Sequence, residues 1–368
     1  MTTITYKDSG VDYDAMDPFK REAQTSASRT ARHLTRFGFK EVGTSRGESA
    51  YLIEAPFGFL AHVEEGLGTK NLVADAMYAL TGKSYYDQVA ECTVAMIVND
   101  IITLGALPIS VAMHLAIGDS KWLDDETRRQ DLIRGWEMAC HKAQCSWGPG
   151  ETPTLRNMVS PETAILSGSA IGVIGPENKK LDGLRIKDDD AIVMIGSSGI
   201  HANGLTLARK IADKLPEGYL TKLSDGRAYG DALLDPTIIY VQLMEAIMLS
   251  GIDLHYAVNI TGHGWRKLMR ANADFTYVVT DIPEPQPIFH FIQKYGPVDD
   301  VEAYGNLNMG AGFALYLPMN NAQAVIHMAK MLGLNAWITG YIKSTVGEKK
   351  VIIKPKGIEF DSETLTVR

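Results

Sequence analysis

The sequence predicts an α/β fold divided into two domains, and three observations support this expectation. The chain has 368 residues, which is more than a single hydrophobic core usually organises. Short apolar segments of strand length alternate with helix-length segments along the chain. A charged, glycine-containing stretch at 175–190 interrupts the apolar pattern near the middle. We therefore expect an N-terminal domain at 1–174 and a C-terminal domain at 175–368.

The individual elements follow from segment length and from turn residues at the segment ends. In the first domain we expect strands near 51–53, 59–63, 109–116 and 163–174, and helices near 72–80, 88–104 and 125–145. In the second domain we expect strands near 191–195, 275–279, 312–317 and 336–342, and helices near 205–215, 236–249, 288–295 and 322–332. The polar tail after Val351 predicts one surface strand.

Composition excludes several classes of function. The net charge is -8 and no basic block is present, which disfavours a nucleic-acid partner. No run approaches about 18 uncharged apolar residues, and 1–21 lacks the regions of a signal peptide, so we expect no membrane partner and a cytoplasmic location. The three cysteines, Cys92, Cys140 and Cys145, have no metal-ligand spacing and predict reduced thiols.

The segment at 60–70, LAHVEEGLGTK, joins an apolar strand to two carboxylates, a glycine pair and Thr-Lys. The N–H groups of a short glycine loop can bind phosphate oxygens, and Lys70 would add positive charge. Glu64 or Glu65 could bind Mg²⁺ carried by a nucleotide. The spacing differs from that of a P-loop. A strand-to-turn segment with surface charges would look the same, so the binding and structural interpretations both stay open.

A buried helix is predicted at 87–104, because this segment is apolar nearly all round and Gly105 and Pro108 follow it. Asn99 and Asp100 lie within it. A buried aspartate needs a cation, a hydrogen-bonding partner or a shifted pKa. Asp100 is therefore a candidate ligand, and the alternative is a capping or salt-bridged residue.

The segment at 145–152, CSWGPGET, contains glycines and a proline that bend the chain before Glu151. Such a bend would let the backbone approach a ligand closely. An ordinary turn with an exposed glutamate is the alternative interpretation.

Two later loops have the composition of anion sites. SSGIHANG, at 197–204, follows an apolar run and precedes a predicted helix. Free N–H groups at a helix start, with Ser197, Ser198 and Asn203 as donors, suit the phosphate of a ribonucleotide. The alternative is a capped loop with a solvent-facing His201. ITGHGW, at 260–265, has a similar pattern of residues, and it too could be a ligand-binding loop or a capped helix start.

Taken together and in order, these motifs resemble the phosphoribosylformylglycinamidine cyclo-ligase family, also called aminoimidazole ribonucleotide synthetase. The resemblance covers most of the chain and rests on the joint order of the motifs. They are YKDSGVD (6–12), GLGTK (66–70), VAMIVND (94–100), GALP (105–108), CSWGPGET, GSSGIHANGLTLARKI (196–211), LLDPTIIYV (233–241), ITGHGW, LNMGAGF (307–313) and NAWITGYI (335–342).

The resemblance implies a fold and a reaction. It implies that strands of the first domain pair across a homodimer to form a barrel, with active sites between the domains. It also implies a purine-biosynthesis reaction in which ATP phosphorylates the amide oxygen of formylglycinamidine ribonucleotide. An internal nitrogen then displaces phosphate and closes the imidazole of aminoimidazole ribonucleotide. The expected cofactors are ATP and Mg²⁺, and the expected partners are a small ribonucleotide and a second copy of the chain.

The resemblance also implies roles for individual residues, by motif matching. The ATP-binding residues would be Gly68, Thr69, Lys70, Asn99 and Asp100. The metal ligands would be Glu65, Asp100 and Glu151. The substrate phosphate would be bound by Ser197, Ser198 and Asn203, and the catalytic positions would be His201, Asn259 and His263.

Several residues depart from the family pattern, so the chain resembles a divergent member of the family. Glu65 replaces an aspartate, Asn259 replaces a histidine, and His263 replaces a glycine. Asparagine cannot transfer a proton at neutral pH, so either His263 substitutes or that step is lost. The segment at 38–48 replaces a glycine-rich loop. The alternatives are therefore a related enzyme that phosphorylates another small metabolite, or a non-catalytic nucleotide-binding paralogue.

Overall fold

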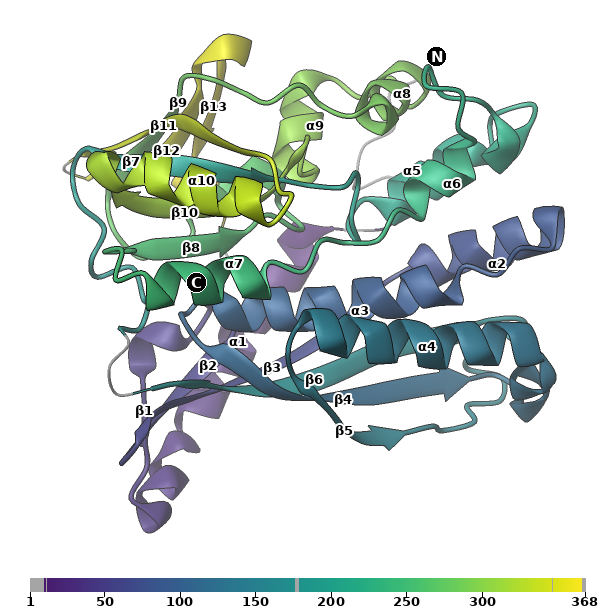
Figure 1. The fold of residues 1–368 in the computed structure, drawn as a ribbon, viewed down its shortest axis with the longest axis horizontal. Coiled ribbons are helices and arrows are strands. Elements are labelled where there is room, and N and C mark those ends of the chain that lie inside the picture. The colour runs from purple at the N-terminus through teal and green to yellow at the C-terminus, as the bar shows by residue number, and fades with distance from the viewer. Residues whose placement is uncertain (1–9, 11, 176–178, 346, 366–368) are drawn as a thin grey trace.

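The computed structural model describes residues 10, 12–175, 179–345 and 347–365, and it contains two β-sheets with helices packed on them (Figure 1). Helices α2 (Lys70–Thr81), α3 (Tyr86–Ile102) and α4 (Glu126–Lys142) lie on the face of the first sheet that is turned toward the second half. Helix α3 also contacts α7 (Val241–Leu249) and β8 (Tyr256–Asn259) of the second half. Of the motif at 6–12, only Gly10 and Asp12 are among the described residues.

The first sheet has six strands in the order β1-β2-β3-β6-β4-β5 and is shaped like half a barrel. Its neighbours are antiparallel except for the parallel pair β4–β5. Burial alternates along β6, as expected for a sheet covered on one face. The strands are β1 (Lys40–Glu41), β2 (Tyr51–Ala55), β3 (Gly58–Gly66), β4 (Leu107–Ile117), β5 (Ser146–Glu151) and β6 (Ala164–Ile174).

Glycines on β6 let α3 approach the first sheet closely. A Cβ at Gly168 would overlap the carbonyl oxygen of Ala112 and would lie 3.0 Å from Cδ1 of Ile97. A Cβ at Gly172 would lie 2.8 Å from Cγ2 of Ile101. With the sheet on one side and the second half on the other, most of α3 is buried, as its sequence predicted.

The second sheet has seven strands in the order β13-β12-β9-β11-β7-β10-β8. All neighbours are antiparallel except β9 and β12. Every residue of the central strand β7 is buried, which explains its continuous apolar sequence. Besides β8, the strands are β7 (Asp190–Gly196), β9 (Phe275–Val279), β10 (Ala311–Pro318), β11 (Ala336–Ser344), β12 (Lys350–Ile353) and β13 (Ile358–Asp361).

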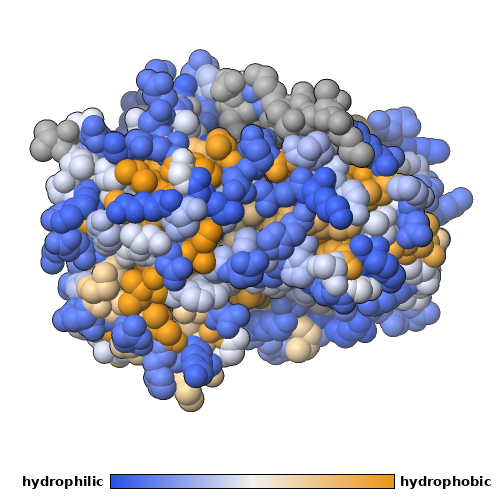
Figure 2. Space-filling model, turned by 90° about the horizontal axis from the view of Figure 1, so that it is seen from above, coloured by the Kyte–Doolittle hydropathy of each residue, from blue (hydrophilic) through white to orange (hydrophobic). Residues whose placement is uncertain are grey.

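The remaining helices surround these sheets. Helix α1 (Tyr13–Ser28) precedes the first sheet, and α7 lies between α3 and the second sheet (Figure 1). The others are α5 (Leu205–Ala212), α6 (Tyr229–Leu233), α8 (Pro287–Tyr295), α9 (Asp300–Asn306) and α10 (Ala322–Met331). No helix within the described ranges is long and apolar enough to cross a membrane. The face seen in Figure 2 is largely hydrophilic, with hydrophobic residues in separate small groups.

The predicted α/β class is confirmed, but four element predictions were wrong. The helix predicted at 125–145 ends at Lys142. The bend predicted at 145–152 is mostly edge strand β5, whose glycines interrupt the alternation of apolar and polar residues that usually marks a strand. The helix predicted at 236–249 begins only at Val241, because 235–240 is extended and bonds to the first half. The tail forms two strands, β12 and β13, where one was expected.

Candidate functional site

A cavity of about 580 Å³ lies where the two halves meet, and its volume is in the range of small-molecule sites. The first half contributes β3 and α3 to its wall, and α1 covers one side. The second half contributes Asn203 and the segment from Asn259 to Arg270. Its polar lining residues include Lys20, Glu48, Glu65, Asp100, Asn203, Asn259, Thr261, His263, Lys267 and Arg270.

Two carboxyl groups face each other in this cavity. Glu65 lies near the end of β3 and Asp100 near the end of α3, and their side chains are hydrogen-bonded. Burial and the neighbouring charge of Asp100 raise the pKa of Glu65 to about 8, although Lys267 partly opposes this shift. The Glu65 carboxyl group is therefore mostly protonated at neutral pH.

Two side chains from the second half approach this pair. Asn259 ends β8, and its Nδ2 donates a 2.7 Å hydrogen bond to Oδ1 of Asp100. Lys267 is buried, and its Nζ donates to the hydroxyl of Thr261. Burial and the charge of Arg270 lower the pKa of Lys267 to about 8, while Asp100 and Glu65 oppose that shift. The cavity thus holds a buried cation near two carboxyl groups.

Lys267 was not identified from the sequence. It lies in the short helical turn Gly264–Met269, between buried Trp265 and buried Met269. A lysine inside an otherwise apolar run was the available signal, since lysine is seldom buried without a partner.

His263 also lines the cavity. It adopts a positive φ of 67° at the start of the turn Gly264–Met269, and its Nε2 lies 3.6 Å from Oδ2 of Asp17 in α1. Burial, followed by the charge of Lys267, lowers the pKa of His263 to about 3. Its imidazole is therefore neutral at neutral pH.

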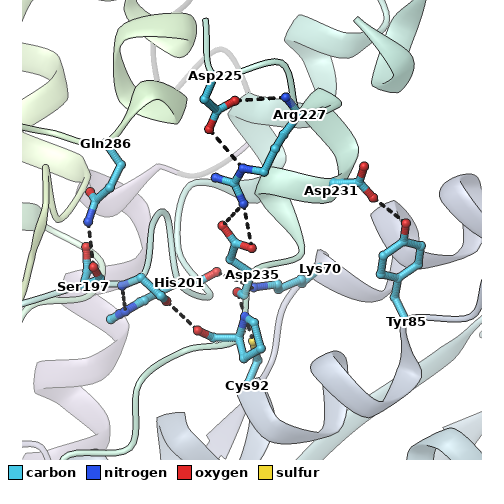
Figure 3. Close-up of polar contacts among 12 residues, drawn as sticks. Lys70, Tyr85, Cys92, Ser197, His201, Asp225, Arg227, Asp231, Asp235 and Gln286 are labelled. Carbon is cyan, nitrogen blue, oxygen red and sulfur yellow. Dashed lines mark hydrogen bonds and ion pairs between the residues drawn. The ribbon is translucent and has the colours of Figure 1, made fainter. Parts of the chain in front are cut away.

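Lys70 and Asn99, both expected to contact phosphate, hold the extended segment 235–240 instead. Nζ of Lys70 is buried and donates to the carbonyl oxygens of His201 at 3.0 Å and Asp235 at 2.6 Å (Figure 3). Nδ2 of Asn99 donates to the carbonyl of Ile238 at 2.8 Å, and its Oδ1 accepts from the Tyr240 N–H at 3.0 Å. Neither side chain lines the cavity.

His201 is buried in its own loop rather than facing the cavity. Its Nε2 accepts a 3.2 Å hydrogen bond from the Ser198 N–H, which requires an unprotonated Nε2 (Figure 3). Burial, together with the charge of Lys70, lowers the pKa of His201 to about 3. Both serine hydroxyls of this loop already donate hydrogen bonds within the protein. Ser197 donates to the side-chain oxygen of Asn308, and Ser198 donates to the carbonyl of Pro236. Of this loop, Asn203 lines the cavity.

The other expected site residues lie outside the cavity. Gly68 is exposed with a φ of 77°, and Oγ1 of Thr69 lies 3.3 Å from Oγ1 of Thr206. Glu151 is exposed on β5, and β6 and β4 separate that strand from β3. Three strand spacings place Glu151 about 14 Å from Glu65. Within the described ranges, no group of three or more His, Cys, Asp or Glu side chains could hold a metal ion.

The comparisons with known proteins agree with this arrangement of two halves. The model of the AIR synthase related protein N-terminal domain matches residues 60–174, and that of the C-terminal domain matches 187–352. A phosphoribosylformylglycinamidine cyclo-ligase from Methanocaldococcus jannaschii is 32% identical over 343 residues, which are 92% of each chain. The chain belongs to the phosphoribosylformylglycinamidine cyclo-ligase family. The resemblance found in the sequence is therefore confirmed.

Other members and neighbours extend the comparison. The cyclo-ligase of Carboxydothermus hydrogenoformans is 32% identical over 368 residues, covering 96% of this chain and 99% of the relative. The solved structure of hydrogenase maturation protein HypE in complex with ATP has a TM-score of 0.57 at 16% identity, covering 84% of this chain and 87% of that one. Thiamine-monophosphate kinase from Stenotrophomonas maltophilia has a TM-score of 0.58 at 18% identity, covering 81% and 86%. These two likenesses show the two-domain fold.

Proposed function

We propose that this family member is an ATP-dependent enzyme that closes the imidazole ring of aminoimidazole ribonucleotide in purine biosynthesis. ATP phosphorylates the amide oxygen of formylglycinamidine ribonucleotide, and the internal nitrogen then displaces phosphate. The observation that carries the proposal is the match to relatives named as cyclo-ligases, at 32% identity over 92% of this chain and 92% of the relative in one case. The cavity supports it, because residues of motifs from both halves line the same space.

The carboxyl pair fits a magnesium ion. Mg²⁺ in nucleotide sites is usually bound by one or two carboxylates, with phosphate oxygens and water completing the octahedron. Glu65 and Asp100 are adjacent and can supply two such ligands once Glu65 loses its proton. We restrict the metal proposal to this pair, because Glu151 of the same chain lies on the far edge of the sheet. The bound ion would offset the charge of the triphosphate.

Basic residues of the cavity fit the phosphate groups. Lys267 and Arg270 come from the second half, and Lys20 comes from α1. Positive groups fixed in a buried site stabilise the charge on a transferred phosphoryl group without solvent reorganisation. We therefore assign the phosphoryl-stabilising role to Lys267 and Arg270 rather than to Lys70, whose Nζ is engaged by two carbonyl groups.

Proton transfer is the step in which this chain departs from the family. Asn259 occupies the histidine position and donates to Asp100, so it orients the carboxyl pair instead of exchanging a proton. His263 lines the same cavity with a neutral imidazole, and the negative charge of a bound triphosphate would raise its lowered pKa toward the range of a general base. We propose His263 as the substitute base and a structural role for His201, which the loop buries.

A second candidate is a related ATP-dependent enzyme that acts on another small metabolite, or a paralogue that binds nucleotide without turnover. Asn259 favours this candidate, because it removes the proton-transferring group expected at that position. Genetic complementation separates the candidates. Expression of the chain should restore growth of a cyclo-ligase-deficient strain without added purine, and His263→Gln should weaken that rescue. Failure of the well-expressed wild-type chain to restore growth would favour the second candidate.

A further inference from the structure

Helix α4 ends in a turn that brings two cysteines together. Gln144 has a φ of 53°, in the left-handed region, and its N–H donates to the carbonyl of His141 at 3.1 Å. The N–H of Cys145 donates to the carbonyl of Cys140, also at 3.1 Å. These two bonds define a Schellman motif, in which the side chains at the positions of Cys140 and Cys145 commonly pack against each other.

The geometry of this turn holds the two cysteines at short range, as a disulfide requires. A disulfide needs Cα atoms roughly 4.4–6.8 Å apart. The bond between the Cys145 N–H and the Cys140 carbonyl keeps the two residues close, and their thiols form a hydrogen-bonded pair. Both cysteines are free thiols in the structure. The four residues between them belong to the end of α4 and the following turn, so the cross-link would close a short local loop.

The two thiols differ in access and in acidity. Cys140 is buried, whereas Cys145 is partly exposed. The hydrogen bond from Cys140 lowers the pKa of the Cys145 thiol, while that same contact and burial raise the pKa of Cys140. Because the thiolate is the nucleophile, Cys145 is suited to react first with a reagent from solvent. Cys140 then lies next to it as the resolving thiol.

Cys92, in contrast, has the environment of a structural cysteine. It is fully buried in α3, and its Sγ accepts a 3.2 Å hydrogen bond from the Thr237 N–H. Free cysteines of this kind behave as small apolar residues. Cys92 therefore provides a matched internal control for the pair at the end of α4.

We propose that Cys140 and Cys145 form a reversible intramolecular disulfide by exchange with a low-molecular-weight disulfide such as oxidised glutathione. The Cys145 thiolate attacks one sulfur of the reagent, whose S–S bond breaks and releases one thiol. The Cys140 thiol then loses its proton to solvent and attacks Sγ of Cys145, which releases the second thiol. The protein dithiol is oxidised, and the small disulfide is reduced to two thiols.

The disulfide would cross-link the end of α4 to the start of β5. Cys140 is part of the hydrophobic core, and Trp136 of α4 lies 6.1 Å, between ring centroids, from Trp147 of β5. The cross-link would therefore fix an edge strand of the first sheet to the helix packed beside it. This site is independent of the proposed ATP chemistry, since neither cysteine lines the cavity.

The test uses the full chain incubated with oxidised glutathione, followed by alkylation of remaining thiols and peptide mass mapping. In the wild type and in Cys92→Ser, the Cys140 and Cys145 peptides should be joined, with the loss of two hydrogens, and dithiothreitol should restore both thiols. Cys140→Ser should instead retain one glutathione on Cys145. Cys145→Ser should leave Cys140 unmodified.

Two results would overturn the proposal. One is a wild-type protein whose Cys140 and Cys145 both remain open to alkylation after treatment. The other is a wild-type protein that keeps glutathione on Cys145 beside a free Cys140. Both readouts come from the unsubstituted chain, so they hold even if a variant fails to fold.

Discussion

Asp100 connects the two halves of the cavity through its side chain. It accepts from Asn259 at 2.7 Å and is hydrogen-bonded to Glu65. If this pair binds the metal that accompanies ATP, Asp100→Asn should lower Mg²⁺-ATP affinity by roughly 10–100-fold or more, the range seen even for groups that only support metal ligands. Isothermal titration calorimetry measures the change, with circular dichroism to confirm the fold.

Glu64→Gln is the matched control for this substitution. Glu64 is the exposed neighbour of Glu65 on β3, and its replacement removes the same single charge. Its Mg²⁺-ATP affinity should stay close to that of the wild type. Equal affinity in Asp100→Asn and the wild type would remove Asp100 from the nucleotide site.

His201 should make the fold sensitive to acid. Its pKa is lowered to about 3 in the folded state, against about 6.5 in an unfolded chain. Between those values the unfolded state binds a proton that the folded state does not, so stability is lost as the pH falls from about 6.5. The loss attributable to this group is about 1.4 kcal/mol per pH unit.

Replacing His201 should therefore reduce the acid sensitivity. In His201→Gln, the free energy of unfolding should fall less steeply between pH 6.5 and 4. Urea unfolding at several pH values measures the slope, and the remaining slope includes the contribution of His263, whose pKa is also lowered to about 3. His290 is exposed on α8, so His290→Gln should keep the wild-type slope. An identical slope in His201→Gln would show that His201 is not neutral and buried.

Strand β10 packs closely against the loop that carries His201. A Cβ at Gly312 would overlap the hydroxyl of Tyr240 and the imidazole of His201. Gly312→Ala should therefore destabilise the fold by about 1–3 kcal/mol, the usual cost of overpacking. Urea unfolding measures it against Gly43→Ala, where a Cβ would meet no atom within 4 Å. Equal stabilities of the two variants would mean that β10 does not approach the loop this closely.

Elements whose sequence shows one clear apolar pattern were predictable from the chain alone. The predicted strand at 275–279 coincides with β9, and the predicted buried helix at 87–104 overlaps most of α3. Helix α1 was not predicted, because most of its described side chains are polar or exposed. The extended segment 235–240 was mistaken for a helix start, because its partners Lys70 and Asn99 are distant in the sequence.

The candidate site could be predicted in part, where polar residues fall within the motifs. Glu65, Asp100, Asn203, Asn259 and His263 were all expected, and they line one cavity. Lys70 lies in a motif that resembles a phosphate-binding loop. No sequence pattern shows that its ammonium group would instead donate hydrogen bonds to two backbone carbonyls of the second half. Competition from tertiary contacts of this kind explains why Lys70, Asn99 and His201 lie elsewhere.

Lys70 also joins the two halves of the molecule. Its ammonium group, at the start of α2, donates to carbonyl oxygens of His201 and Asp235 in the second half. Lys70→Met should leave both acceptors unsatisfied and lower the free energy of unfolding by about 1–3 kcal/mol for each. Lys214→Met, at an exposed lysine, is the control. A Lys70→Met protein that keeps full stability and loses only ATP affinity would instead make Lys70 a phosphate ligand.

The open face of the first sheet fits the homodimer that the family resemblance implies. Ile165 and Ile171 of β6 are apolar and remain 45% and 48% exposed on it. Pairing with a second copy would bury them and complete the half-barrel. Sedimentation velocity should therefore show a dimer for the wild type and a shift to monomer for Ile171→Lys. Leu249→Lys, at an exposed residue at the end of α7, should leave the dimer intact. A monomeric wild type at micromolar concentration would contradict this assembly.

The ring-closing activity is tested most directly by steady-state ADP release from Mg²⁺-ATP, with and without formylglycinamidine ribonucleotide. The proposal predicts that the ribonucleotide stimulates ADP release and that aminoimidazole ribonucleotide accumulates in equal amount, despite Glu65 and Asn259 at their positions. Bound ATP with no stimulation by the ribonucleotide, and no aminoimidazole ribonucleotide formed, would contradict it.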